Sequence, residues 1–352
     1  MSDPRRVAVL APNWLGDAVM ALPAIADLRR RFPEARIVVA ARRSVADLFR
    51  LVGFVDDVID QDVEALHASG ADVALLLPNS FASAWLVRRA GIAERWGYAT
   101  DWRGWLLTRA VRRPKGRLHQ GAYYQHLIRA LGIDALGTEA LGIDVGPLEP
   151  ALTIPDSAVT SARDLLAGRG WDRERSLVVL APGAAYGTAK RWIPAHVSRL
   201  INDLVRQGRT CVLVGSRADA PTTRGIRDAV NDTSRAQVID VSGETSLEML
   251  AATLSIAHAC VSNDSGAMHL AAAVGTPLVA LFGPTRESET APLTRRGGLA
   301  EVLTHQVWCR PCMLRECPID HRCMTGIDPA RVLVSVKRLL GSDPSEELAK
   351  GI

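Results

Sequence analysis

The sequence predicts an α/β protein with two units, each built on a doubly wound parallel sheet. Short apolar runs alternate with segments whose apolar residues recur at helical spacing, and this alternation occurs twice along the 352 residues. Between the two alternations, residues 142–176 lose the rhythm and contain three clustered prolines. We therefore expect a Rossmann-like domain at 1–155, a linker at 156–176, a second Rossmann-like domain at 177–327 and a final helix within 328–352.

The first half begins with an apolar strand at 7–10, and a loop leads from it into a helix whose apolar stripe covers 18–28. Further strands are expected at 37–40, 58–59 and 73–77, followed in turn by helices at 45–51, 62–68 and 82–90. This order is typical of a parallel sheet covered by helices.

The second half repeats the pattern after a helix at about 157–168. Strands are expected at 177–181, 210–214, 237–241, 259–261 and 278–282, with helices at 194–207, 219–230, 246–256 and 266–274. Asp328 and Pro329 are suited to be the N-cap and first residue of the last helix.

Composition and sequence patterns argue against a membrane-spanning protein and against a secreted protein. The chain is 48% hydrophobic and 23% charged, with a net charge of only +4, which is typical of a globular protein. It has no apolar run of bilayer-spanning length, and its N-terminus lacks a secretory cleavage pattern. We therefore expect a cytoplasmic protein.

A polar turn at 262–266 lies between a predicted strand and a helix, where ligands bind in open α/β sheets. Asp264 can accept hydrogen bonds from sugar hydroxyls. Ser265 and the Gly266 amide lie at a helix N-terminus, which favours an anion, and His269 follows one turn later. The alternative is that Asp264 or Ser265 only caps the helix.

A second loop, at 182–192, follows the first strand of the second half. Its small residues let the backbone approach a pyrophosphate, and Lys190 and Arg191 supply positive charge, although the spacing is not that of a Walker loop. The turns at 215–217 and 243–245 belong to the same sheet edge. They either hold a nucleoside or are plain turns with helix caps.

Asp17 follows Gly16 in the loop after the first strand. A carboxylate in that position is suited to act as a general base that takes a proton from an acceptor hydroxyl. The alternative is a helix cap.

Residues 102–131 are basic and contain no acidic residue. The segment holds Arg103, Arg109, Arg112, Arg113, Lys115, Arg117 and Arg129, together with Trp102, Trp105, Tyr123 and Tyr124. It is either a solvated surface or a wall for an anionic partner, such as a phosphorylated acceptor, an anionic membrane surface or nucleic acid. No known nucleic-acid motif accompanies it.

The six cysteines fall into two groups. Cys211 and Cys260 lie in predicted strands and are expected to be small buried hydrophobes. The other four form C-x2-C-x4-C-x5-C, at Cys309, Cys312, Cys317 and Cys323. This spacing fits no standard zinc finger, so structural zinc, an iron–sulfur cluster and a reduced or disulfide-linked cluster all stay open, none of them catalytic.

Four segments, at 13–23, 77–81, 182–192 and 263–284, resemble the ADP-heptose:lipopolysaccharide heptosyltransferases of glycosyltransferase family 9, above all the type II members. They occur in order along nearly the whole chain. The resemblance implies a GT-B fold, with two domains facing across a cleft and the final helix packing back on the first. It also implies inverting, metal-independent transfer of heptose from ADP-L-glycero-D-manno-heptose to the first heptose of the lipopolysaccharide inner core.

By position, Asp17 is similar to the family's catalytic base and Lys190 to its donor-phosphate lysine. Some relatives, chiefly type I, place a threonine pair before this lysine, where Ala185 and Tyr186 stand here. The expected donor-binding residues are Gly183, Ala184, Thr188, Lys190, Arg191, Ser216, Asp264, Ser265, Gly266 and His269. The expected acceptor-binding residues are Asn13, Trp14, Gly16, Asn79, Ser80, Arg103, Arg112, Arg113 and Lys115.

The implied partners are ADP-heptose and the Kdo–lipid A inner core, with the enzyme peripheral on the inner face of the cytoplasmic membrane. No nucleic acid and no catalytic cofactor are expected. One alternative is a type I or III heptosyltransferase or another GT-B enzyme, such as a nucleotide-sugar epimerase. A second alternative is a non-enzymatic ligand- or nucleic-acid-binding protein, in which Asp17 would be dispensable.

Overall fold

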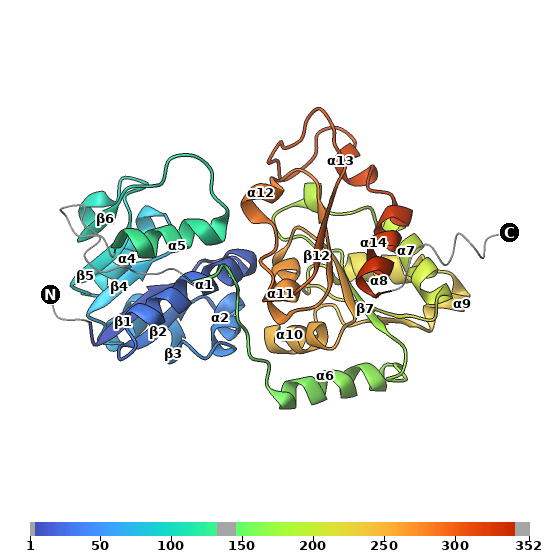
Figure 1. Ribbon diagram of the computed structural model, residues 1–352, viewed down its shortest axis with the longest axis horizontal. Coiled ribbons are helices and arrows are strands. Elements are labelled where there is room, and N and C mark those ends of the chain that lie inside the picture. The colour runs from blue at the N-terminus through green and yellow to red at the C-terminus, as the bar shows by residue number, and fades with distance from the viewer. Residues whose placement is uncertain (1–3, 132–145, 342–352) are drawn as a thin grey trace. The chain divides into compact units, whose positions relative to one another are not determined.

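The structure is a computed structural model that describes residues 4–131 and 146–341 (Figure 1). Its contacts divide the chain into two compact units, Met1–Thr153 and Ile154–Ile352. Each unit contains one six-stranded parallel sheet with helices packed on it. Within the described ranges, no helix is both long enough and apolar enough to cross a membrane.

The first unit has the strand order β3-β2-β1-β4-β5-β6. Its strands are β1 Arg6–Leu10, β2 Arg36–Ala41, β3 Asp57–Asp60, β4 Val73–Leu76, β5 Glu94–Tyr98 and β6 Arg109–Val111. Its helices are α1 Leu15–Arg31, α2 Arg43–Arg50, α3 Val63–Ala68, α4 Phe81–Arg89, the 3₁₀ turn η1 Gly104–Leu106 and α5 Gln120–Leu131. The strand order reverses between β1 and β4, which is where ligands bind in doubly wound sheets.

The second unit has the order β12-β11-β10-β7-β8-β9 and reverses between β7 and β10. Its strands are β7 Leu177–Ala181, β8 Thr210–Leu213, β9 Val238–Asp240, β10 Ala259–Asn263, β11 Leu278–Phe282 and β12 Ala300–Thr304. Its longer helices are α6 Asp156–Gly168, α7 Pro194–Arg206, α8 Ala220–Asp228, α10 Leu247–Ser255, α11 Gly266–Val274 and α14 Pro329–Leu339. Its short helices are η2 Thr188–Lys190, α9 Asp232–Arg235, α12 Glu287–Thr290 and α13 Arg322–Thr325.

The central strands form because their sequences are almost continuously apolar. Every residue of β7 and β11 is buried, as expected for parallel strands covered on both faces. Sequence reasoning missed β5, β6 and β12. Two of these, β6 and β12, are edge strands with charged residues and partial exposure, so their apolar signal is weak.

The segment 156–176, expected to be a linker, falls within the second unit of the contact division. Its helix α6 packs through Ala158 and Ala162 on Ala252 of α10. The contact division falls after Thr153, and only Ile154 and Pro155 separate it from the start of α6 at Asp156.

The last helix, α14, belongs to the second unit. Asp328 caps α14 by accepting a hydrogen bond from the Ala330 amide, as the sequence predicts. Val332 and Val336 are fully buried in the core around β10 and β11, because that core is closed on one side by α7 and α14. Residues 342–352 lie outside the described ranges.

Candidate functional site

Two loops of the second unit flank the point where its strand order reverses. One follows β7 and contains residues 182–187, and the other joins β10 to α11. Asn263 ties them together, because its Nδ2 donates to the Pro182 carbonyl at 2.6 Å and its Oδ1 accepts from the Trp192 amide at 3.1 Å. The fold thus brings both sequence-predicted donor loops to one site.

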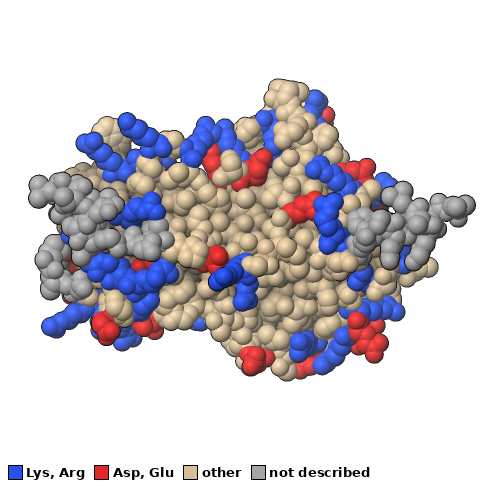
Figure 2. All heavy atoms as spheres, in the orientation of Figure 1, with Lys and Arg blue, Asp and Glu red and all other residues tan. Residues whose placement is uncertain are grey.

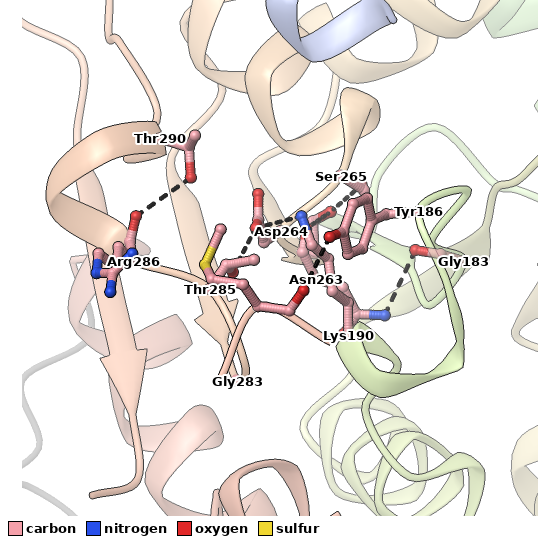
Figure 3. Close-up of polar contacts among 12 residues, drawn as sticks. Gly183, Tyr186, Lys190, Asn263, Asp264, Ser265, Gly283, Thr285, Arg286 and Thr290 are labelled. Carbon is pink, nitrogen blue, oxygen red and sulfur yellow. Dashed lines mark hydrogen bonds and ion pairs between the residues drawn. The ribbon is translucent and has the colours of Figure 1, made fainter. Parts of the chain in front are cut away.

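Lys190 and Asp264 meet at this site (Figure 3). The Lys190 Nζ lies 2.6 Å from Asp264 Oδ2, and the Thr285 hydroxyl donates to the same oxygen at 2.6 Å. Both charged side chains are largely buried. Asp264 is not the helix cap: the N-cap of α11 is Ser265, whose side chain makes no capping bond and lies 3.2 Å from the Ser262 hydroxyl.

Tyr186 is a site residue that sequence reasoning noted only as a departure from the family pattern. Its ring lies 4.7 Å from the Lys190 Nζ and 5.2 Å from the Arg315 guanidinium, so it contacts two cations. Its hydroxyl donates to the Met313 carbonyl at 2.9 Å. The sequence shows only that Tyr186 precedes the turn that bears Lys190, which does not reveal this contact.

Asp219 is a second residue that was missed. One carboxylate oxygen accepts from both the amide and hydroxyl of Ser216, at 3.0 and 2.6 Å, and the other lies 3.5 Å from the Arg191 guanidinium. A Cβ on Gly183 would lie only 2.6 Å from this carboxylate, so the loop needs glycine there. Asp219 directly precedes α8, and the sequence predicted it only as the first residue of a helix at 219–230.

The remaining predicted donor residues occupy the same strand ends. Ala184 is buried, Thr188 is exposed at the start of η2, and Gly266 is half-buried at the start of α11. His269 is buried within the first turn of that helix.

The cysteine-bearing segment, residues 309–323, packs on the loop that carries Lys190 and on the loop after β11. The Arg315 carbonyl accepts from the Ala189 amide at 3.0 Å, and the Met313 amide donates to the Pro284 carbonyl at 2.9 Å. Arg310 donates to the Gly283 carbonyl at 2.7 Å. This segment therefore supports the loop that carries Lys190.

Four thiols of that segment line one small cavity together with Ala189 and Pro284. They are Cys309, Cys312, Cys317 and Cys323, all present as free thiols. Burial, followed by the neighbouring thiols, raises the pKa of Cys323. Within the described ranges, no three His, Cys, Asp or Glu side chains are arranged to hold a metal ion, so the predicted zinc or iron–sulfur site gains no support.

The other two cysteines are buried in strands, as predicted. Cys211 lies in β8 and Cys260 in β10. Burial raises the pKa of each thiol to about 12, which keeps both protonated and unreactive at neutral pH.

In the first unit, Asp17 lies in the first turn of α1, beside the reversal between β1 and β4. Asp17 is half-buried, as are Gly16 in the same helical turn and Asn13 in the loop before it. Trp14 is the exposed N-cap residue. Burial, and then the charge of Asp17, raises the pKa of Tyr124 well above its usual value. The carboxylate of Asp17 is therefore near the buried Tyr124 of α5, and the N-cap position of α1 is held by Trp14.

The loop after β4 carries Asn79 and Ser80. The Asn79 amide lies 3.1 Å from the Tyr123 hydroxyl, and the Ser80 hydroxyl caps α4 by accepting from the Ser83 amide at 3.3 Å. The Ser80 side chain therefore stabilises the start of α4.

Arg103 does not belong to an acceptor wall, which corrects the sequence prediction. Its side chain is completely buried, and it donates to the carbonyl oxygens of Tyr98, Pro78 and Ser80 and to the Ser83 hydroxyl, at 2.5–3.2 Å. Burial lowers the pKa of its guanidinium to about 10, so it stays charged at neutral pH. Sequence alone does not distinguish this arginine from its exposed neighbours.

The other predicted cations are exposed in the loop after β6, where Arg112, Arg113 and Lys115 lie. The Arg113 guanidinium lies 5.6 Å from the centre of the Tyr123 ring. Figure 2 shows Lys and Arg side chains gathered along the upper edge of the first unit.

Comparison with known proteins finds a matching family and several similar proteins. The sequence model of "Glycosyltransferase family 9 (heptosyltransferase)" matches residues 62–322. Lipopolysaccharide heptosyltransferase 2 of Salmonella typhimurium is 29% identical, and the match covers 96% of this chain and 99% of that protein. The structure of Escherichia coli ADP-heptose lps heptosyltransferase II is 30% identical, with a TM-score of 0.81 over 95% of this chain and 98% of that one.

The family 9 glycosyl transferase of Veillonella parvula is only 18% identical but has a TM-score of 0.80 over 96% of this chain and 98% of that one. It shares the fold. The predicted α/β class, with two doubly wound parallel sheets of the GT-B type, is confirmed.

Proposed function

Because the chain belongs to glycosyltransferase family 9 (heptosyltransferase), we propose that it moves heptose from ADP-L-glycero-D-manno-heptose to the first heptose of the lipopolysaccharide inner core. One observation carries the proposal: Lys190, Asp264 and Thr285 converge at the strand reversal of the second unit. This position offers a lysine, a carboxylate and a hydroxyl at a strand reversal, which suits a sugar nucleotide.

The second unit binds the donor in this proposal. As the bond from the sugar to ADP breaks, negative charge grows on the leaving diphosphate. Lys190 and Arg191 lie on one loop, and Ser265 and Gly266 begin α11, whose N-terminal amides favour an anion. The backbone at Gly183 and Ala184 approaches the same diphosphate, and Ser216 and His269 contact the rest of the donor.

Lys190 exchanges partners when the diphosphate binds. Without donor, its ammonium is neutralised by Asp264 in a poorly solvated position. A diphosphate oxygen then neutralises part of the lysine's charge, while the Asp264 carboxylate still accepts the hydrogen bond from the Thr285 hydroxyl. Asp264 thus positions the lysine and can also accept from a sugar hydroxyl through its second oxygen.

The first unit supplies the base. Asp17 removes the proton from the attacking hydroxyl of the acceptor, whose oxygen forms a bond to the anomeric carbon as the bond to the ADP oxygen breaks. Attack from the face opposite the leaving group inverts the anomeric centre. Asn13, Trp14 and Gly16 surround Asp17 and are proposed to contact the acceptor, with Asn79 and Ser80 of the adjoining loop.

The exposed cations after β6 are proposed to bind the acidic part of the acceptor. Arg112, Arg113 and Lys115 present positive charge to solvent, which suits the phosphates and carboxylates of a Kdo–lipid A core. Such an acceptor is anchored in a membrane, so we place the enzyme on the inner face of the cytoplasmic membrane. Because Lys190 and Arg191 are proposed to neutralise the diphosphate without a metal ion, we expect a chelator to leave the transfer rate unchanged.

The function is tested by mass spectrometry of products formed from ADP-heptose and truncated acceptors with no, one or two inner-core heptoses. The proposal predicts that the one-heptose acceptor gains a single heptose with equimolar ADP release. Preference for the other acceptors would reassign the chain to type I or III. Conversion of ADP-heptose to an epimer without any acceptor would contradict the proposal.

A further inference from the structure

Four aromatic side chains of the first unit are exposed and have no part in the proposed transfer. They form what we term the aromatic surface, composed of Phe81, Trp85, Trp102 and Trp105, which are 38%, 44%, 93% and 65% exposed. Isolated exposed apolar residues are normal, but clustered large ones usually mark an interaction site.

Three of these rings are in continuous contact. The Phe81 ring centre lies 6.3 Å from that of Trp85, in a stacked arrangement, and 6.3 Å from that of Trp105. The Arg88 guanidinium lies 5.9 Å from the centre of the Trp105 ring, so a cation borders the patch. Because these rings pack on one another, they are less suited to receive separate nucleic-acid bases than to form one apolar surface.

A strained turn holds the surface in place. Asp101 and Trp102 adopt φ values of 49° and 57°, in the left-handed region that is costly for residues other than glycine. The buried Arg103 binds the loop after β4, and the Asp101 carboxylate accepts from the Phe81 amide at 2.6 Å. These bonds on either side hold the turn in its strained conformation, in which the Trp102 side chain is exposed.

Exposed positive charge also lies on this unit, both at one sheet edge and beside the Trp105 ring. Strands β4, β5 and β6 are parallel, so the loops after them emerge together. Arg112, Arg113 and Lys115 after β6 are exposed, Arg88 at the end of α4 is exposed beside Trp105, and 102–131 contains no acidic residue. Tryptophan settles at the headgroup level of bilayers, and exposed Lys and Arg add attraction to anionic lipids.

We propose that the aromatic surface and its bordering cations dock the first unit on an anionic lipid bilayer. The inference deepens the proposed function, because it names the surface through which an enzyme acting on a membrane-anchored acceptor reaches the membrane. Docking itself requires neither donor nor acceptor, so it can be measured without them.

The test is co-sedimentation of the full-length protein with vesicles of phosphatidylglycerol and phosphatidylcholine, and with phosphatidylcholine alone. The variants are Trp102→Ser, Trp102→Ser/Trp105→Ser and the control Trp308→Ser, a tryptophan of the second unit that is 78% exposed. We expect preferential binding to the anionic vesicles, a loss of about tenfold or more in the double variant, and no loss in the control. Equal binding by the double variant and the wild type would overturn the proposal.

Two further measurements keep the result unambiguous. Circular dichroism and a thermal melt check folding, and Trp102→Ser alone, at a nearly fully exposed position, should fold normally and show a partial loss of binding. A single-stranded oligonucleotide tests the competing partner: tryptophan-dependent binding to it, without binding to vesicles, would also overturn the proposal.

Transfer assays separate this inference from the proposed function. With a water-soluble acceptor oligosaccharide, the double variant should match the wild type, whereas transfer to an acceptor embedded in anionic vesicles should fall in parallel with vesicle binding. Tryptophan-dependent vesicle binding by a protein that transfers heptose to no acceptor would refute the proposed function and leave the docking surface supported.

Discussion

Arg103 and Lys190 are both buried cations, but their surroundings give them different roles. Arg103 is surrounded by neutral carbonyl and hydroxyl oxygens, all of which belong to its own unit, so it holds two loops together. Lys190 faces a carboxylate and an aromatic ring beside two loops that end at a strand reversal. At the scale of single residues, the partner decides whether a buried charge is structural or available to a ligand.

Replacement of Arg103 by Met should destabilise the first unit by about 3 kcal/mol, because several buried oxygens would lose a charged donor. Urea unfolding followed by circular dichroism measures the change. The matched control, Arg112→Met, removes an exposed arginine and should change stability by less than about 0.5 kcal/mol. Equal effects of the two replacements would contradict the buried position of Arg103.

Replacement of Lys190 by Met should destabilise the second unit by about 3 kcal/mol, since it leaves the largely buried Asp264 carboxylate without its cation. The double variant Lys190→Met/Asp264→Asn should recover much of that loss, which urea unfolding of all four proteins of the cycle would measure. If the single and double variants were equally destabilised, the two side chains would not be coupled as described.

At the scale of elements, the segment 309–323 has a supporting role that its cysteines do not reveal. It contacts the Lys190 loop through Arg315 and Met313 and the loop after β11 through Arg310. Two loops from distant parts of the chain, of which one carries Lys190, are thus supported by one segment. Support of this kind keeps the ligand contacts in place before the ligand binds.

Gly187 is the point where this support is tightest, because a Cβ there would lie 2.2 Å from the Arg315 carbonyl oxygen. Gly187→Ala should therefore displace the donor loop and weaken ADP binding by about tenfold, a loss of 1.4 kcal/mol measurable by calorimetry. The control Gly168→Ala, at a helical glycine with open space around its Cβ position, should leave ADP affinity unchanged. Wild-type ADP affinity in Gly187→Ala would show that the contact does not position the loop.

The limits of sequence reasoning also appear at this scale. Strands β1, β7 and β11 were predictable because they are buried on both faces and read as unbroken apolar runs. Strand β6 was not, because it begins with an arginine inside a basic segment and pairs on one side only. The loops after β7 and β10 could be placed on one edge because parallel strands end together.

The side-chain partners within those loops could not be predicted in the same way. Asp219 and Tyr186 are recognisable as site residues only after folding brings them to Arg191 and Lys190. The misassignment of Arg103 has the same origin, because burial depends on tertiary packing and the basic segment gives every arginine the same local context.

At the scale of the whole molecule, each unit carries one half of the proposed chemistry at its own strand reversal. The second unit presents cations and a helix N-terminus suited to a diphosphate, and the first presents Asp17 at the start of α1. A division of this kind predicts that donor binding and acceptor activation can be impaired separately, because they depend on residues of different units.

The most direct test of this division is one comparison of Asp17→Asn with the wild type, in which turnover and ADP affinity are measured on the same preparations. The account predicts a fall in kcat of about a hundredfold or more, because the general base is lost, with ADP affinity unchanged because the diphosphate contacts lie in the second unit. Turnover at the wild-type rate, or a parallel loss of ADP binding, would contradict it.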